Sequence, residues 1–297
     1  NIVIHTSGPF QSQDHIVAKV CIEAKAHYID LSDSREFVTK IDELDQTAKT
    51  HEVLIVSGAS SVPGLSSAII DNYLPEFSEL TSVDYAIATG QLTNQGLATT
   101  EGVLSYAGKP FKSIIDGKKQ SIYGWQGLRL KKFWHLNKRF LGNCDVPDLD
   151  LFTKRYPSLQ NIRFQAGLEL KALHLILFLM AGLVRCRLLP PLNKFASFML
   201  KASHLFNRFG KDNTGFYMTL SGLSKTNIKK AIRFDIYAKG GDGLYIPCVP
   251  AILLAERIAN GSLKQTGATA CVGLINLKDY LKTLKRLNLN IIWQDTQ

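Results

Sequence analysis

The first eighty residues alternate short apolar runs with amphipathic segments. The runs at 2–4 (IVI), 27–33 (HYIDLSD) and 52–60 (EVLIVSGAS) each end in turn residues or carboxylates, which is typical of strands covered on both faces. Between them, residues 14–25 and 35–50 carry apolar side chains at helical spacing. Strands and helices that alternate at these distances predict a parallel sheet with right-handed crossovers.

The pattern changes after residue 82. Longer stretches now separate β-rich segments, and this spacing predicts a mixed or antiparallel sheet with inserted helices. The basic and aromatic stretch from 108 to 140 is predicted to be rich in loops, and helices are expected near Pro250 and over 276–287. The strand candidates are 83–90, 161–170, 215–222, 231–240 and 266–274.

These patterns predict an α/β protein. Three parallel strands make half of a doubly wound domain, so we expect the C-terminal half of a Rossmann-like parallel sheet, followed by an α+β domain with a mixed or antiparallel sheet. The predicted divisions are 1–80 for the first, 81–275 for the second, with inserted helices at about 167–210, and 276–297 for a helix and tail that pack back.

Several motifs resemble the saccharopine dehydrogenase/reductase-like oxidoreductases. They occur in the same order as in that family, and the resemblance is strongest over 1–115 and 214–285. The motifs are HTSGPFQ (5–11), HYIDLSD (27–33), SGASSVPGLSSAIID (57–71), IPCVPAILLAERIANG (246–261) and TGATACVGLINLKDYL (266–281).

The resemblance implies a dinucleotide-binding domain joined to a substrate and dimerisation domain. It therefore implies NAD or NADP as cofactor, an amino-acid or keto-acid-like substrate, and a homodimer. In such proteins a G-x-G-x-x-G turn after the first strand holds the pyrophosphate. The sequence has no such turn at the right spacing. We therefore expect the N-terminal half of the dinucleotide domain to be missing from this chain, and no cofactor to bind tightly to it.

The opening strand has a particular place in this interpretation. In the usual strand order, loss of the other half would leave it at an edge of the sheet, and an apolar edge invites pairing. We expect residues 1–6 to be an edge strand covered by a partner subunit, a swapped element or the second domain.

Two loops are candidates for ligand binding. Each follows a strand at its carboxyl end, where open α/β sheets bind ligands, although a strand-ending turn or a helix N-cap needs the same residue types. The resemblance places the first loop along the cofactor. The cofactor-side candidates are Thr6, Ser7, Gly8, Pro9, Phe10, Ser57 and Gly58, and the substrate-side candidates are Ser60, Ser61, Val62 and Pro63.

The other polar residues carry weaker signals. Asp30 and Asp33 follow a strand and are interpreted as turn residues, and His5 as a hydrogen-bonded histidine of the core. Histidines and cysteines lack the spacing of a metal site, and no residue stands out as catalytic. Five widely separated cysteines favour a reducing compartment and hence a cytoplasmic protein.

The middle of the chain is unusual in being both apolar and basic. Residues 173–184 (LHLILFLMAGLV) are almost all apolar, and 192–211 is amphipathic and basic. Twelve residues are too few to span a bilayer, which needs about 20 in a helix. Burial in the core or a dimer interface is the default interpretation, with a basic amphipathic pair on a membrane surface as the alternative.

That alternative suggests a second class of function. The protein would be a non-catalytic membrane-peripheral or scaffolding member of the fold that uses segment 109–211. Its 35 basic and 25 acidic residues give a net charge of +10, but no nucleic-acid-binding motif accompanies them, and a nucleic-acid partner is not expected.

Overall fold

The computed structural model describes residues 1–93 and 96–296. By its internal contacts the chain divides into two compact units. Unit 1 contains Asn1–Asn72, Val146–Phe152 and Tyr245–Leu289, and unit 2 contains Tyr73–Asp145, Thr153–Leu244 and the chain from Asn290.

Sheet A lies in unit 1, and in the described residues it has four strands in the order β1-β2-β3-β12. Every neighbouring pair is parallel. All four residues of β3 are buried, as expected for the continuous apolar run of a parallel strand that is covered on both faces. The strands are β1 (Ile2–His5), β2 (His27–Asp30), β3 (Leu54–Ser57) and β12 (Gly267–Ala270).

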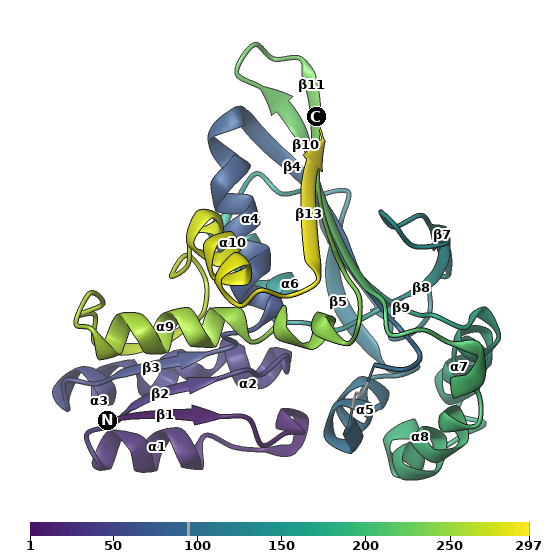
Figure 1. Cartoon of the computed structure of the whole chain (residues 1–297), viewed down its shortest axis with the longest axis horizontal. Coiled ribbons are helices and arrows are strands. Elements are labelled where there is room, and N and C mark those ends of the chain that lie inside the picture. The colour runs from purple at the N-terminus through teal and green to yellow at the C-terminus, as the bar shows by residue number, and fades with distance from the viewer. Residues whose placement is uncertain (94–95, 297) are drawn as a thin grey trace. The chain divides into compact units, whose positions relative to one another are not determined.

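Helices cover sheet A. The side chains of α1 and α3 pack with Tyr28 and Ile55 in one buried cluster, while α9 contacts β1 and β2. Figure 1 shows α9 lying over the strands and running along their direction. The described helices that lie wholly or partly in unit 1 are α1 (Ile16–Glu23), α2 (Arg35–Thr39), α3 (Asp45–Thr50), α4 (Ser66–Tyr73), α6 (Asp148–Arg155), α9 (Val249–Ala259) and α10 (Leu277–Arg286).

Two features of unit 1 differ from the expectation. The segment 35–50 is not one helix, because α2 and α3 are separated by a 3-10 turn at Ile41–Leu44. Near the break, the Thr39 hydroxyl donates a hydrogen bond to the Arg35 carbonyl at 2.7 Å, a contact that often bends helices. The strand expected at 266–274 belongs to sheet A and not to the second sheet, since β12 pairs with β3.

Sheet B lies in unit 2, and in the described part of the chain it has seven strands in the order β13-β11-β10-β4-β9-β8-β7. Only the β4–β9 pairing is parallel within this described sheet, so it is mixed. The predicted fold class, a parallel sheet and a separate mixed sheet, is therefore confirmed. The strands are β4 (Phe77–Thr89), β7 (Arg129–Lys131), β8 (Arg139–Asn143), β9 (Asn161–Leu168), β10 (Thr214–Ser224), β11 (Lys229–Ala238) and β13 (Ile291–Thr296).

The stretch from 108 to 140 contains strands where loops were expected. Besides β7 and β8 it forms a hairpin of β5 (Pro110–Ile115) and β6 (Lys118–Tyr123). The hairpin turns at Asp116 and Gly117, whose φ angles are 52° and 72°. Positive φ at both central residues is the geometry that Asp-Gly favours in two-residue hairpins, so this dipeptide is the signal that the sequence interpretation missed.

The helices of unit 2 are α5 (Gly96–Ser105), α7 (Lys171–Arg185) and α8 (Ala196–His204). In α7 the buried residues are His174, Leu177 and Ala181, which lie along one side of the helix. Burial in the core therefore accounts for only one side of this apolar segment, and burial of the other side in a dimer interface stays a prediction. Within the described residues, α7 and the other helices are too short or too polar to cross a bilayer.

The opening strand β1 lies at an edge of sheet A, as predicted. It pairs with β2 on one side, and α9 of the same unit contacts it. Val3 and Ile4 nevertheless remain 37% and 46% exposed. Cover by a partner subunit or a swapped element stays a prediction.

Candidate functional site

The loop after β1 forms a tight turn at the carboxyl edge of sheet A. The backbone N–H of Gly8 donates to the Thr6 carbonyl at 3.1 Å, and Gln13 Nε2 donates to the Ser7 carbonyl at 2.6 Å. The turn is thus held by its own chain. Thr6 and Ser7 are exposed, Gly8 and Pro9 half-buried, and Phe10 buried.

Phe10 fixes this turn to the segment after β2. Its ring lies 5.1 Å from that of His5 and 5.2 Å from that of Phe37. Next to it, Gln11 Nε2 donates to Asp33 Oδ1 at 3.0 Å. His5 itself is buried, with Nδ1 2.9 Å from the Tyr28 hydroxyl, so its interpretation as a core histidine is confirmed.

Asp30 ties the end of β2 to the end of β3. Its fully buried Oδ1 accepts the backbone N–H groups of Ser32 at 2.9 Å and Gly58 at 2.8 Å. The first bond is an Asx-type turn, which confirms the interpretation of Asp30 as a turn residue. Burial raises the pKa of the Asp30 carboxyl, and the hydrogen bonds from Gly58 and Ser32 only partly oppose this effect.

The loop after β3 is buried throughout. Ala59 N–H donates to the Asp30 carbonyl at 2.7 Å, and Ser60 N–H donates to the Gly58 carbonyl at 2.8 Å. The structure therefore brings the two candidate loops to one edge of sheet A, on either side of the β2 loop, but it exposes only the first. Ser57, Gly58, Ser60, Ser61, Val62 and Pro63 are all buried.

This edge can position a ligand more readily than it can transfer a proton. The exposed residues Thr6 and Ser7 and the backbone around Gly8 can offer hydrogen bonds, while the buried small residues of 57–60 lie at the same edge beyond the β2 loop. Asp30 is enclosed, and its acceptor oxygen is already used by two N–H groups. It acts as a positioning residue for the loops after β2 and β3.

Gly58 is expected to tolerate no side chain. It has φ +76°, and a Cβ there would lie 2.8 Å from Pro63 Cδ and 3.1 Å from Val38 Cγ1. We expect Gly58→Ala to cost about 3 kcal/mol of unfolding free energy, from left-handed strain and overpacking together. Urea denaturation measures the loss.

Gly261 provides the matched control. Its φ is +71°, and nothing lies within 4 Å of the added Cβ. Gly261→Ala should therefore cost only the backbone strain, about 1 kcal/mol. Equal losses in the two variants would show that the space around Gly58 is not restrictive.

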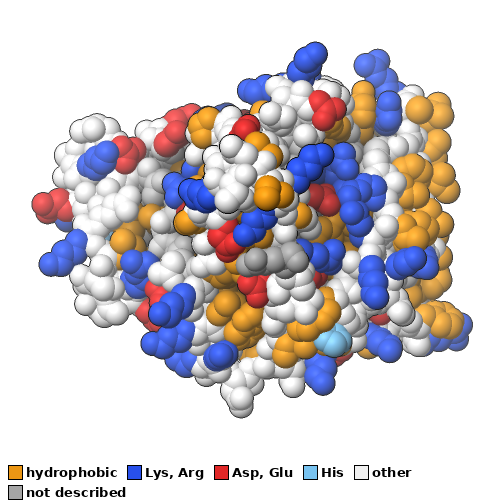
Figure 2. Space-filling view, turned by 90° about the horizontal axis from the view of Figure 1, so that it is seen from above, with side chains coloured by type: hydrophobic (Ala, Val, Ile, Leu, Met, Phe, Trp, Pro, Cys, Tyr) orange, Lys and Arg blue, Asp and Glu red, His pale blue; other side chains and the backbone are white. Residues whose placement is uncertain are grey.

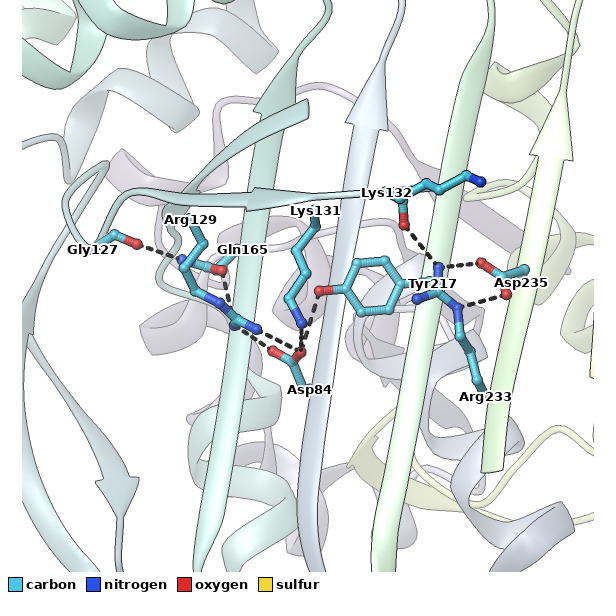
Figure 3. Close-up of polar contacts among 9 residues, drawn as sticks. All are labelled: Asp84, Gly127, Arg129, Lys131, Lys132, Gln165, Tyr217, Arg233 and Asp235. Carbon is cyan, nitrogen blue, oxygen red and sulfur yellow. Dashed lines mark hydrogen bonds and ion pairs between the residues drawn. The ribbon is translucent and has the colours of Figure 1, made fainter. Parts of the chain in front are cut away.

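A second polar cluster lies on sheet B (Figure 3). Asp84 on β4 receives two hydrogen bonds from the Arg129 guanidinium, at 2.7 and 3.0 Å, and a third from the Tyr217 hydroxyl at 3.3 Å. Arg233 pairs with Asp235 at 2.7 and 2.8 Å, and its guanidinium carbon lies 4.5 Å from the Tyr217 ring centroid.

The pKa shifts in this cluster favour a stable network of ion pairs and hydrogen bonds. Burial would raise the pKa of Asp84, but the hydrogen bonds and charges of Arg129 and Lys131 outweigh burial and lower it. Burial and the Asp84 charge raise the pKa of Tyr217, which keeps its hydroxyl a donor. Arg233 also donates to the Lys132 carbonyl at 3.2 Å, so the network holds the segment around β7 on the sheet.

Comparison with solved structures finds proteins of similar fold. Saccharopine dehydrogenase (L-Glu forming) from Saccharomyces cerevisiae matches with a TM-score of 0.65 at 12% identity, over 95% of this chain and 82% of that chain. The chain has a Rossmann-like α/β fold. At this identity the likeness establishes the Rossmann-like fold alone.

Other dehydrogenase structures match less well. An engineered D-amino acid dehydrogenase bound to NADP+ has a TM-score of 0.46 at 12% identity, covering 95% of this chain and 81% of that one. A meso-dapdh mutant with DAP from Clostridium tetani has a TM-score of 0.42 at 10% identity, covering 96% and 80%. These scores are too low to add to the argument. No protein-family model matches the chain, and no curated protein matches it either.

The sequence interpretation missed the sheet B cluster. A signal was present, since Asp84 and Asp235 each stand within a β-rich alternating segment where apolar residues predominate. A carboxylate at such a position needs a buried partner. Which cation supplies it depends on strand order, because Arg129 is 45 residues from Asp84 along the chain.

Proposed function

We propose that the protein functions as an NAD(P)-dependent oxidoreductase on an amino-acid or keto-acid-like substrate, similar to saccharopine dehydrogenase. The observation that supports this most is the likeness of fold over 95% of the chain, with TM-score 0.65. The motifs HTSGPFQ and SGASSVPG, which carry the sequence resemblance, lie at the carboxyl edge of the parallel sheet, where such folds bind ligands.

The residues at this edge fit the nicotinamide side of a dinucleotide. In the proposal Thr6, Ser7 and Gly8 contact the cofactor with hydroxyl and backbone groups, and Ser57 and Gly58 contribute from the loop after β3. Bound cofactor would supply or accept the hydride. Ser60, Ser61, Val62 and Pro63 are proposed to adjoin the substrate. They are buried in the structure, so they would shape the pocket wall more than bind by open hydroxyls.

The pyrophosphate side has no counterpart among the described residues. No G-x-G-x-x-G turn occurs in the sequence, and in the residues the structure describes no glycine-rich turn follows β1 into α1. A tight phosphate grip uses such a turn at a helix N-terminus. We therefore expect the 297-residue chain to bind NADH and NADPH with dissociation constants weaker than micromolar.

Calorimetric titration tests this proposal. NADH and NADPH would be titrated into the 297-residue chain at concentrations up to the millimolar range. We expect saturable binding with a dissociation constant weaker than micromolar. Micromolar binding would contradict the predicted weakness, and absence of saturable binding would contradict the proposed oxidoreductase.

A steric variant locates the site. Ser7→Trp would fill the space beside the exposed turn and is expected to reduce cofactor affinity more than tenfold. Thr47→Trp, at an exposed position on α3, serves as the control. Equal affinities in the two variants would place the cofactor elsewhere.

A further inference from the structure

An exposed apolar surface covers α7, α8 and the turns beside α8. Of 22 large hydrophobic residues that are exposed in the described chain, ten fall between residues 171 and 211. Leu179, Phe198 and Leu205 are 64%, 73% and 77% exposed. The others are Leu175, Ile176, Leu183, Leu188, Phe195, Phe206 and Phe209. We call this set the apolar face.

The exposed part of α7 in the apolar face is one regular side of the helix. In α7 the exposed Ile176, Leu179 and Leu183 recur at helical spacing. At about 100° per residue they lie on the side opposite the buried residues His174, Leu177 and Ala181. A helix that is apolar on both sides is buried on both in an ordinary domain, whereas among the described residues nothing covers the outer side of α7.

Basic residues accompany the apolar face. Between 171 and 211 the chain has four lysines and three arginines and not one Asp or Glu. All seven basic side chains are exposed: Lys171, Arg185, Arg187, Lys194, Lys201, Arg208 and Lys211. Figure 2 shows hydrophobic side chains gathered along one edge of the molecule with Lys and Arg beside them, on the side of the view where Figure 1 places α7 and α8.

A groove of about 560 Å³ adjoins the end of α7. Lys109, Arg185 and Arg187 line it together with Leu188 and Pro190, and no Asp or Glu is among the described residues that form its wall. The Arg185 guanidinium carbon lies 4.0 Å from the Tyr123 ring centroid, which directs this cation. Three cations beside apolar side chains match a phosphate group attached to acyl chains.

We propose that the apolar face and its basic residues bind the surface of an anionic phospholipid membrane. The exposed Leu, Ile and Phe side chains enter the boundary between headgroups and acyl chains, and the lysines and arginines contact the lipid phosphates. The binding is peripheral, since α7 has 15 residues and a spanning helix needs about 20.

Charge favours a membrane over a second copy of the chain. In a two-fold symmetric dimer this surface would face itself, which brings two sets of seven cations together with no carboxylate in the segment to pair with them. An anionic membrane instead neutralises these charges while it covers the apolar side chains. This inference is independent of the proposed oxidoreductase activity.

Vesicle flotation of the 297-residue chain tests the proposal. Vesicles of phosphatidylcholine alone would be compared with vesicles that contain about a third phosphatidylserine. We expect at least tenfold greater partitioning to the anionic vesicles at low salt, with a marked decrease when salt screens the charges. Absence of binding to anionic vesicles at low salt would overturn the proposal.

Paired variants identify the surface. Leu179→Ser with Phe198→Ser should reduce partitioning at least tenfold, whereas Ile228→Ser with Ile292→Ser, also at exposed apolar positions, should not. Arg187→Glu with Lys194→Glu should likewise reduce it about tenfold or more, unlike Lys119→Glu with Lys229→Glu. Circular dichroism checks that each variant folds.

Two results would overturn the assignment. One is equal loss of partitioning in the control pairs. The other is a dimer, detected by sedimentation without vesicles, that Leu179→Ser with Phe198→Ser dissociates, because this surface would then be an interface between copies.

Discussion

Replacement of Asp30 by alanine is expected to destabilise the protein by about 2–4 kcal/mol, because it leaves two buried N–H groups without an acceptor. Those groups belong to Ser32 and Gly58, and they hold the loops after β2 and β3. The loss exceeds that of an ordinary surface substitution, since Asp30 is fully buried. Urea denaturation at neutral pH measures it.

Asp30→Asn keeps a hydrogen-bond acceptor at this position and removes the negative charge. The amide oxygen can accept both N–H groups, so below about pH 4, where Asp30 is protonated, this variant should lie within about 1 kcal/mol of the parent protein. The pKa of Asp30 is raised on folding by burial, so the folded state holds its proton more strongly than the unfolded state. This contribution to stability is present below the unfolded pKa of about 4 and is lost as pH rises through the folded value.

The two variants should therefore diverge with pH. Relative to the parent protein, Asp30→Asn should become more stable as pH rises above about 4, because the amide carries no charge to bury. Asp30→Ala should remain destabilised throughout. If both variants lost the same stability at every pH, the hydrogen bonds to Ser32 and Gly58 would not be what Asp30 contributes.

Acid is expected to destabilise unit 2 through His174. This side chain on α7 is fully buried beside the rings of Trp125 and Phe140, and burial lowers its pKa to about 4, with a backbone hydrogen bond to Leu141 only partly opposing this. The unfolded state takes up a proton near pH 6.5, before the folded state does. Stability is therefore retained above pH 6.5 and declines as pH falls toward 4, by about 3 kcal/mol in all.

His174→Asn tests the origin of this decline. The amide oxygen can replace Nδ1 as the acceptor of the Leu168 N–H, and the side chain does not titrate in this range. We expect a lower but flatter stability between pH 6.5 and 4, measured by urea denaturation across that range. His204→Asn, at an exposed position on α8, is the control and should keep the decline. An unchanged slope in His174→Asn would assign the acid sensitivity to other groups.

Local pattern predicted most elements but not always their partners. The strands β1, β2 and β3 follow from continuous apolar runs, and α9 from Pro250 at its start and Asn260-Gly261 at its end. The pattern could identify residues 267–270 as a strand but not assign it to a sheet, because β12 reaches β3 from more than 200 residues away. The β5–β6 hairpin was overlooked, although Asp116-Gly117 indicates it.

The candidate site, too, could be predicted from the sequence only in part. That Thr6–Phe10 and Ser57–Pro63 share one edge follows from parallel pairing, because the carboxyl ends of parallel strands meet there. Their difference in exposure does not follow, since it depends on the packing of Pro63 and Val38 around Gly58. The apolar face is similar. Its composition is evident in the sequence, but only the structure shows which side of α7 is left uncovered.

Each sheet takes one edge strand from late in this sequence, which affects how the chain folds during its synthesis. Sheet A receives its fourth described strand from residues 267–270, and sheet B receives β13 from 291–296. During translation β3 therefore remains unpaired on one side until residues 267–270 have left the ribosome, and β11 until 291–296 have done so. An unpaired strand is a site for aggregation, and pairing so distant in sequence is slow. A nascent chain of this protein should therefore depend on chaperones until these strands have been made.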